Sequence, residues 1–197
     1  MTIILASTSQ IRAQILARAG LDFVTAAPRV DEEAIRDAMQ ADGASPRDIA
    51  DSLAEAKALK ISDKNAQALV LGCDQILVLG DVIFTKPETP DHAISQLHAL
   101  RGQTHHLYSA IVIYQNGQPL WRHIGHARLT MRAMSDQALA SYVATEWESI
   151  RHSVGCYKIE ERGIQLFSQI DGDVFTIQGL PLLPLLNYLA LRGIIAS

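Results

Sequence analysis

The segment "HHLYSAIVIYQNGQPLWRHIGHARLTMRAM", residues 105–134, decides the fold class of this 197-residue chain. Runs with strand character lie on both sides of Asn116-Gly117. An Asn-Gly pair between two such runs is a strong signal for a β-hairpin, because both residues adopt positive φ angles at low cost. We therefore expect two antiparallel strands here.

The segments around this hairpin alternate between strands and helices. We expect further strands at 2–6, 23–28 and 163–172, and helices at about 9–19, 46–60, 90–99, 135–145 and 181–192. Helix starts are indicated by Ser7-Thr8-Ser9, by Ser45 before Pro46, by Pro90-Asp91 and by Ser135-Asp136. Because hairpins are frequent among these elements, the sequence predicts an α/β fold with a mixed sheet flanked by helices.

Composition excludes several classes of protein. The length fits one domain over residues 1–197, or two lobes folded as one unit. No run approaches about 20 apolar residues, so no membrane span is expected. The net charge of −4 without a basic cluster argues against a nucleic-acid partner. Two cysteines without CxxC spacing suit a reducing, cytoplasmic location.

A second hairpin, "GCDQILVLGDVIFTKPETP" at residues 72–90, carries an acid and a base at its open end. A two-residue Gly80-Asp81 turn would place Asp74 and Lys86 on opposite faces, whereas a three-residue loop would set them opposite each other. A structural ion pair and a functional pair are both compatible with this pattern.

The segment "LASTSQIR", residues 5–12, runs from a strand into a helix whose first N–H groups attract anions. Ser7 and Ser9 could add hydroxyl donors, and Arg12 could fork onto phosphate oxygens. The alternative is that a serine caps the helix while Arg12 lies in solvent. The glycines of a Walker loop are absent.

Two other patterns have simpler interpretations. His123 and His126 lie in a predicted strand, where positions i and i+3 point to opposite faces, so they do not form a zinc pair. The apolar run at 179–195 is expected to cover the core, with a homodimer interface as the alternative.

Six blocks of the chain resemble the Maf family, in the family's order. They are "ILASTSQIRAQIL" at 4–16, "VDEEAI" at 30–35, "LAEAKA" at 53–58, "LGCDQILVLGDVIFTKP" at 71–87, "LRGQTHHLYSA" at 100–110 and "IQGLPL" at 177–182. The resemblance implies an elongated α/β structure of two lobes around a cleft, similar to inosine triphosphate pyrophosphatases. It also implies cleavage of nucleoside triphosphates between the α- and β-phosphates, with a divalent metal such as Mg²⁺ or Mn²⁺.

The resemblance assigns roles to particular residues. Ser7, Ser9 and Arg12 match the family's anion-binding opening. Glu32, Lys57, Asp74 and Lys86 match its catalytic positions, with Glu32 and Asp74 as metal ligands and Asp74 also placed to orient or deprotonate the attacking water. Alone, Glu32 and Lys57 would be taken for solvated side chains, and Glu33 is one place away from Glu32.

The later blocks indicate the branch of the family. "GCDQ" at 72–75 and "HSVGCYKIEERGIQLF" at 152–167 resemble the branch that prefers 7-methyl-GTP more than the branch acting on dTTP and UTP. Candidate specificity residues are Gln75, Gln103, Lys158 and Glu160. The alternative for the last two is a solvated pair on a strand.

Three departures from the family pattern bear on the substrate pocket: Gln10-Ile11 before Arg12, Thr85 before Lys86-Pro87, and Arg101 in place of serine. None removes a predicted catalytic group. A rival interpretation is a nucleotide-binding regulator of septum formation without turnover. Retention of an acid for water activation beside lysines favours the enzyme.

Overall fold

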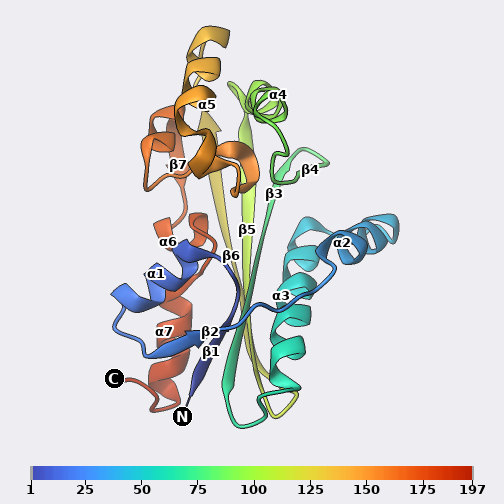
Figure 1. Cartoon of the computed structure of the whole chain (residues 1–197), viewed down its shortest axis with the longest axis vertical. Helices are drawn as coiled ribbons and strands as arrows, with labels where there is room; N and C mark the ends of the chain where they lie inside the picture. The colour runs from blue at the N-terminus through green and yellow to red at the C-terminus, as the bar shows by residue number, and fades with distance from the viewer. Residues whose placement is uncertain (1, 197) are drawn as a thin grey trace. The chain divides into compact units, whose positions relative to one another are not determined.

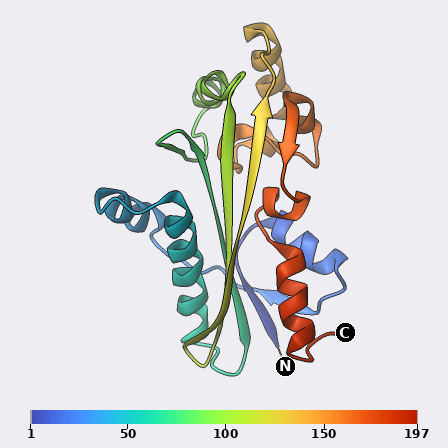
Figure 2. The ribbon, with the colours of Figure 1, turned by 180° about the vertical axis from the view of Figure 1, so that it is seen from behind.

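The computed structural model describes residues 2–196, and Figures 1 and 2 show the ribbon from two sides. Its strands are β1 (Ile3–Ala6), β2 (Phe23–Thr25), β3 (Leu69–Leu79), β4 (Val82–Phe84), β5 (Thr104–Gln115), β6 (Gln118–Met131) and β7 (Phe167–Asp171). Its α-helices are α1 (Gln10–Arg18), α2 (Glu32–Ala41), α3 (Pro46–Ser62), α4 (Pro90–Leu100), α5 (Asp136–Ile150), α6 (Val174–Ile177) and α7 (Leu182–Leu191). Short 3-10 helices, η1 (Val154–Cys156) and η2 (Arg162–Leu166), precede β7.

The seven strands form one mixed sheet in the order β2-β1-β3-β5-β6-β7, with β4 paired to β3. β1 is parallel to β2 and β3, whereas β4 and β7 are antiparallel to β3 and β6. Asn116 and Gly117 have φ angles of 53° and 69°, as a type I′ turn requires. The mixed sheet and the hairpin expected from the sequence are confirmed.

The chain divides into two compact units, and β3, β5 and β6 contribute residues to both. The first unit contains Met1–Gln75, Tyr108–Gly125 and Val174–Ser197. Within it, α1 and α7 cover one face of the strands and α3 covers the other (Figures 1 and 2). Its core joins Leu5 of β1, Leu16 of α1, Leu71 of β3 and Leu185 of α7.

The second unit contains Ile76–Leu107 and His126–Asp173. Its helices α4 and α5 pack together, and α4 also contacts η1. Within its core, the Tyr157 and Phe167 rings meet edge to face, with centroids 4.7 Å apart.

Four expected elements differ from the structure, and the first is the strand expected at 23–28, which ends at Thr25. The strand expected at 163–172 begins only at Phe167, because residues 162–166 form η2. The helix expected to end at 145 continues to Ile150, and α4 is capped by Thr89, whose hydroxyl accepts from the His92 amide, rather than by Pro90-Asp91. Helix α2 was not expected, although Asp31 is its N-cap.

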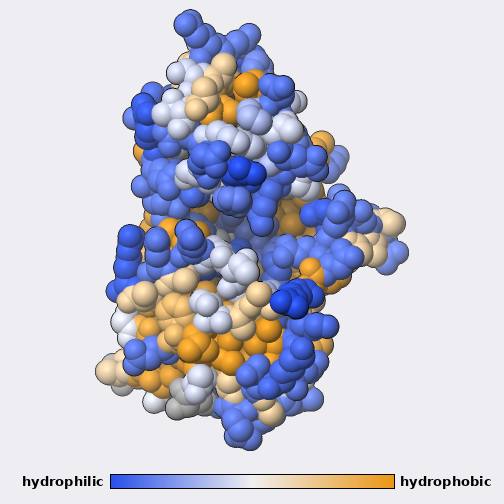
Figure 3. All heavy atoms as spheres, in the orientation of Figure 1, coloured by the Kyte–Doolittle hydropathy of each residue, from blue (hydrophilic) through white to orange (hydrophobic). Residues whose placement is uncertain are grey.

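The apolar C-terminal run packs into the core, as expected. Helix α7 buries Leu182, Leu185 and Leu189 but leaves Leu183 and Leu191 exposed. Apolar residues also gather on the surface over the strands of the first unit (Figure 3), where the edge strand β2 exposes Val24. The homodimer interface stays a prediction. Among the described residues, no helix combines the length and apolarity needed to cross a lipid bilayer.

His105 is a fully buried polar residue in the core of the second unit. Its Nε2 is 2.7 Å from the Tyr157 hydroxyl oxygen, and its Nδ1 has no hydrogen-bond partner among the described residues. Burial, with a smaller contribution from nearby His106, lowers the pKa of His105 from 6.5 to about 4. The folded chain therefore keeps this imidazole neutral where the unfolded chain would protonate it.

We predict that His105 makes the chain less stable as the pH falls from about 6.5 to about 4. Over that window only the unfolded state takes up the proton, which lowers the free energy of unfolding by about 3 kcal/mol. His105→Gln should remove this part of the pH dependence in urea unfolding curves. Gln40→Ala, at an exposed residue that does not titrate, should follow the native profile. Identical profiles for all three proteins would contradict the prediction.

Candidate active site

A close contact between β3 and α3 sets the geometry of the site in the first unit. A Cβ atom at Gly72 would lie 2.1 Å from the Ala54 carbonyl oxygen and 2.7 Å from the Ala58 nitrogen. Any larger residue would therefore push the helix away from the strand. Gly72 and Asp74 share one face of β3, because side chains alternate along a strand. The glycine thus brings Lys57 of α3 within reach of Asp74.

Lys57 lies between two carboxylates. Its Nζ donates to Asp74 Oδ1 at 2.5 Å and is 2.9 Å from Glu32 Oε1. The side chains of Lys57 and Asp74 are 7% and 8% exposed, whereas that of Glu32 is 45% exposed. Glu33 is exposed, so the structure brings Glu32 and not its neighbour to the lysine. Three of the four predicted catalytic residues therefore meet at one point.

Burial dominates the electrostatics of Asp74. It raises the pKa of this carboxyl above its ordinary value, although the nearby charges of Lys57 and Arg12 act in the opposite direction. The negative charge of Glu32 adds to the rise. A carboxylate with a raised pKa binds a proton more readily, which suits a group that takes a proton from water.

The opening segment caps helix α1, as one interpretation of its sequence expected, and its anion-binding role stays a prediction. Ser9 is the N-cap of α1 and accepts from the Arg12 amide at 3.4 Å, while buried Ser7 accepts from the Ser9 amide at 3.1 Å. The expectation that Arg12 would then lie in solvent is wrong. Its half-buried side chain donates from Nε to the Gly179 carbonyl at 2.8 Å and from Nη1 to the Cys73 carbonyl at 2.9 Å. Arg12 is thus fixed beside the residue that precedes Asp74.

Lys86 belongs to the second unit and is exposed just after β4. The ladder pairs Leu77 with Phe84 and Leu79 with Val82, which leaves Gly80-Asp81 as a two-residue turn. The alternative three-residue loop is therefore wrong, and Asp74 and Lys86 are not directly opposed on this hairpin. The catalytic role of Lys86 stays a prediction.

Gln75 is the one specificity candidate within the first unit. Its Nε2 lies 2.9 Å from Ser109 Oγ, 3.2 Å from the Thr176 carbonyl oxygen and 2.9 Å from the Ile177 carbonyl oxygen. The side chain is therefore held against α6.

The other three specificity candidates lie in the second unit. Gln103 is exposed between α4 and β5. Lys158 lies outside any strand or helix, and its Nζ donates to Ser149 Oγ at 2.7 Å. Its ion-pair partner is Glu161, at 3.5 Å, whereas Glu160 is exposed. The expected strand pair is thus corrected, and the specificity roles stay predictions.

The carboxylates fit a divalent cation that also binds phosphate. Glu32 and Asp74 converge on one positive group, the Lys57 ammonium. No group of three or more histidine, cysteine or acidic side chains suited to a metal occurs among the described residues. Mg²⁺ commonly takes one or two protein carboxylates and fills its remaining positions with water and substrate phosphate. Two carboxylates would suit this class of ion, and the divalent metal stays a prediction.

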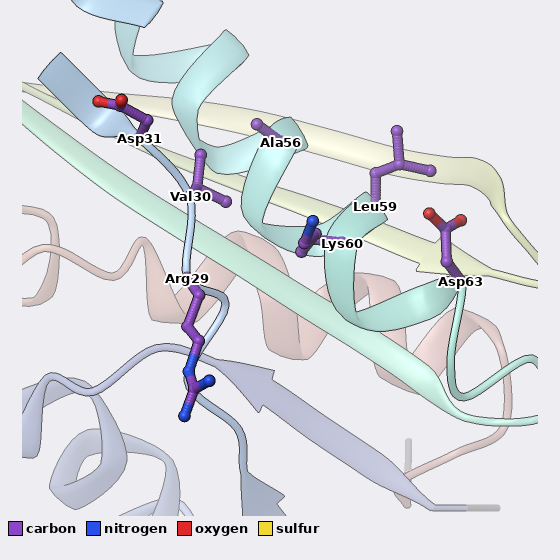
Figure 4. Close-up of a pocket in the computed structure, with 7 residues that line it drawn as sticks. All are labelled: Arg29, Val30, Asp31, Ala56, Leu59, Lys60 and Asp63. Carbon is purple, nitrogen blue, oxygen red and sulfur yellow. The ribbon is translucent and has the colours of Figure 1, made fainter. Parts of the chain in front are cut away.

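Two features near the site carry no signal in the local sequence. One is the buried hydrogen bond that the Ser109 hydroxyl donates to the Thr176 carbonyl of α6. The other is a pocket of about 320 Å³ on the outer side of α3 (Figure 4), lined by Arg29, Val30, Asp31, Ala56, Leu59, Lys60 and Asp63. Its lining contains two cationic and two acidic side chains, so it offers no net charge to an anion.

Comparison with known proteins identifies the family of the chain. A family model described as Maf-like protein matches residues 2–191, nearly the whole chain. The chain belongs to the Maf family. The blocks that resemble the Maf pattern thus reflect true membership, and the lysine and the two acids that meet in the structure lie within three of them.

Relatives of this Maf chain carry names that describe an activity. A protein of Ruegeria pomeroyi named nucleoside triphosphate pyrophosphatase is 58% identical over 98% of this chain and 97% of its own length. A protein of Sphingopyxis alaskensis with the same name is 49% identical over 98% of both chains. A protein of Brucella abortus named 7-methyl-GTP pyrophosphatase is 47% identical over 93% of this chain and 92% of its own.

Proposed function

We propose that this chain is a nucleoside triphosphate pyrophosphatase that cleaves between the α- and β-phosphates, and that 7-methyl-GTP is its preferred substrate. Relatives at 56–58% identity, named nucleoside triphosphate pyrophosphatase, support the reaction class, a hydrolysis. The observation that carries the proposal is the buried Asp74 carboxylate on the Lys57 ammonium, with Glu32 on the same nitrogen. A protein that only bound nucleotide would have no use for this costly arrangement.

The residues of the first unit have complementary roles in this reaction. Asp74 orients the attacking water and accepts its proton, and its raised pKa makes it a better base than an ordinary aspartate. Lys57 holds Asp74 in place and supplies positive charge. Arg12, with Ser7 and Ser9, binds phosphate oxygens and offsets the negative charge that grows on the leaving pyrophosphate. A catalytic role for Lys86, which belongs to the second unit, stays a prediction.

Glu32 and Asp74 would hold a divalent cation, Mg²⁺ or Mn²⁺, together with the substrate phosphates. When bound, such an ion neutralises phosphate charge and polarises the phosphoryl group. Glu32 is suited to this because its side chain is half exposed and lies at the start of α2.

Two lines of support lead to 7-methyl-GTP. The Brucella relatives carry that name at 47% identity, and the "GCDQ" and "YKIEE" segments resemble that branch. The alternative is a dTTP or UTP pyrophosphatase of the same family. A nucleotide-binding regulator of septum formation without turnover is the alternative from a different class. The cytoplasmic location and the absence of a nucleic-acid partner also stay proposals, based on composition.

The first test is pyrophosphate release by the purified chain from 7-methyl-GTP, GTP, dTTP, UTP and CTP, with Mg²⁺ or Mn²⁺. We expect release from 7-methyl-GTP to exceed that from dTTP by at least about 10-fold, the effect of 1.4 kcal/mol in transition-state binding. Chelation by EDTA should stop release. Preference for dTTP or UTP would overturn the substrate and keep the reaction. Nucleotide binding without any release would overturn the reaction.

Asp74→Asn should abolish most turnover while nucleotide binding survives. Loss of a general base costs on the order of 10²- to 10⁴-fold in rate, and the isosteric amide keeps the shape of the site. Steady-state kinetics and calorimetric binding to a non-hydrolysable nucleotide would separate the two effects. Asp22→Asn, at an exposed aspartate of the same unit, should match the native enzyme. Turnover at the native rate in Asp74→Asn would contradict the assignment of Asp74 as the general base.

Glu32→Gln and Glu33→Gln form a matched pair for the metal site. Only Glu32 reaches Lys57, so only its substitution should raise the Mn²⁺ concentration needed for half-maximal activity, by at least about 10-fold. Direct titration of Mn²⁺ by electron paramagnetic resonance, with a bound nucleotide analogue, should show the same weakening. Equal behaviour of the two variants would remove Glu32 from the metal site.

A further inference from the structure

A single buried carbonyl collects three hydrogen bonds in the first unit. The Thr176 carbonyl oxygen accepts from Ser109 Oγ at 2.6 Å, from Gln75 Nε2 at 3.2 Å and from the Gly179 amide at 3.0 Å. Ser109 is fully buried and Thr176 is 1% exposed. Helix α6 is therefore tied to both β3 and β5, and the Gly179 amide joins the following segment to the same carbonyl.

Gly179 transmits this constraint to Arg12. Its amide donates to Thr176, and its own carbonyl accepts from Arg12 Nε at 2.8 Å. Gly179 has a φ of 93°, and a Cβ there would lie 3.1 Å from Arg12 Nε and Nη2. A side chain at this position would be strained and would crowd the guanidinium. The segment is thus shaped to let Arg12 approach its backbone.

The hydrogen bonds form a continuous network that starts and ends on β3. Arg12 Nη1 donates to the Cys73 carbonyl at 2.9 Å, and the chain then continues through Asp74 to Gln75, which returns to Thr176. The two carbonyls engage two of the five N–H donors of a guanidinium. Because both Nε and Nη1 are hydrogen-bonded, the planar guanidinium of Arg12 has a fixed orientation beside Asp74.

We propose that Ser109 is a positioning residue that, together with Gln75, aims the Arg12 guanidinium at the substrate phosphates. This rests on the proposed function, in which Arg12 binds the triphosphate. Ser109 is fully buried and acts through the carbonyls of Thr176 and Gly179. Its hydroxyl is the shortest donor to the shared carbonyl, so its loss should loosen the segment that holds Arg12.

The kinetic test compares Ser109→Ala with Arg12→Ala and with the double variant. Loss of one buried hydrogen bond, worth about 1.4 kcal/mol, should raise KM for the nucleotide about 10-fold and leave kcat within about 3-fold. The double variant should equal Arg12→Ala alone, because Ser109 acts only through Arg12. Ser62→Ala removes an equally buried hydroxyl of the same unit, and it should keep the native KM. Additive effects in the double variant would overturn the proposal.

A second measurement separates this proposal from the proposed function. The Nε–H signal of Arg12, assigned by its loss in Arg12→Lys, should shift and exchange about 10-fold faster with solvent in Ser109→Ala but not in Ser62→Ala. An effect on this signal in a protein that hydrolyses no nucleotide would uphold the positioning and overturn the activity. An unchanged signal would overturn the positioning. If Ser109→Ala does not fold, Ser109→Cys, which keeps a weaker donor, takes its place.

Discussion

The contact between the Lys57 ammonium and the Asp74 carboxylate is the interaction on which the site depends. Removing two charges from water costs several kcal/mol per ion, and the mutual attraction offsets that cost only at short range. Here the distance of 2.5 Å is made possible by Gly72, which lets α3 lie directly on β3. A strand and a helix that packed at an ordinary separation would leave both charges buried and apart.

The surrounding elements reinforce this contact from several directions. Helix α3 is anchored to the sheet by Glu55, which accepts from the Tyr114 hydroxyl at 2.6 Å and from Arg122 Nη2 at 2.9 Å. Helix α2 presents Glu32 from its first turn, where a carboxylate is favoured by the helix dipole. Arg12 is held by the backbone carbonyls of Gly179 and of Cys73, the residue that precedes Asp74 on β3. The charged groups are thus fixed before any ligand binds.

The sequence predicts those features that depend on neighbours in the chain. The Asn116-Gly117 turn, the Ser45 cap of α3 and the Ser9 cap of α1 follow from local backbone chemistry and are confirmed. The contacts of Arg12 with Gly179, 167 residues away, could not be inferred, because no periodicity links them. The turn at Gly80-Asp81 stayed ambiguous because two loop lengths were equally compatible with the residues.

The errors near β7 have a physical reason of the same kind. Residues 162–166 alternate like a strand, but a Cβ at Gly163 would lie 2.5 Å from the Lys158 carbonyl oxygen. The backbone there is packed too closely for an extended ladder and coils into a 3-10 turn. The family resemblance supplied residue roles that local patterns left open, above all Glu32 rather than Glu33.

Strand β3 carries a thiol, Cys73, directly before Asp74. Cys73 points into the core, and burial raises its pKa to about 11; Cys156, also buried, has its pKa raised to about 12. Peroxide and alkylating reagents attack the thiolate and need access to it. Both sulfurs are therefore protected from these reagents, because each is a protonated thiol and each is buried. Strand β3 can thus carry a cysteine next to Asp74, the proposed general base, without exposing a reactive thiolate.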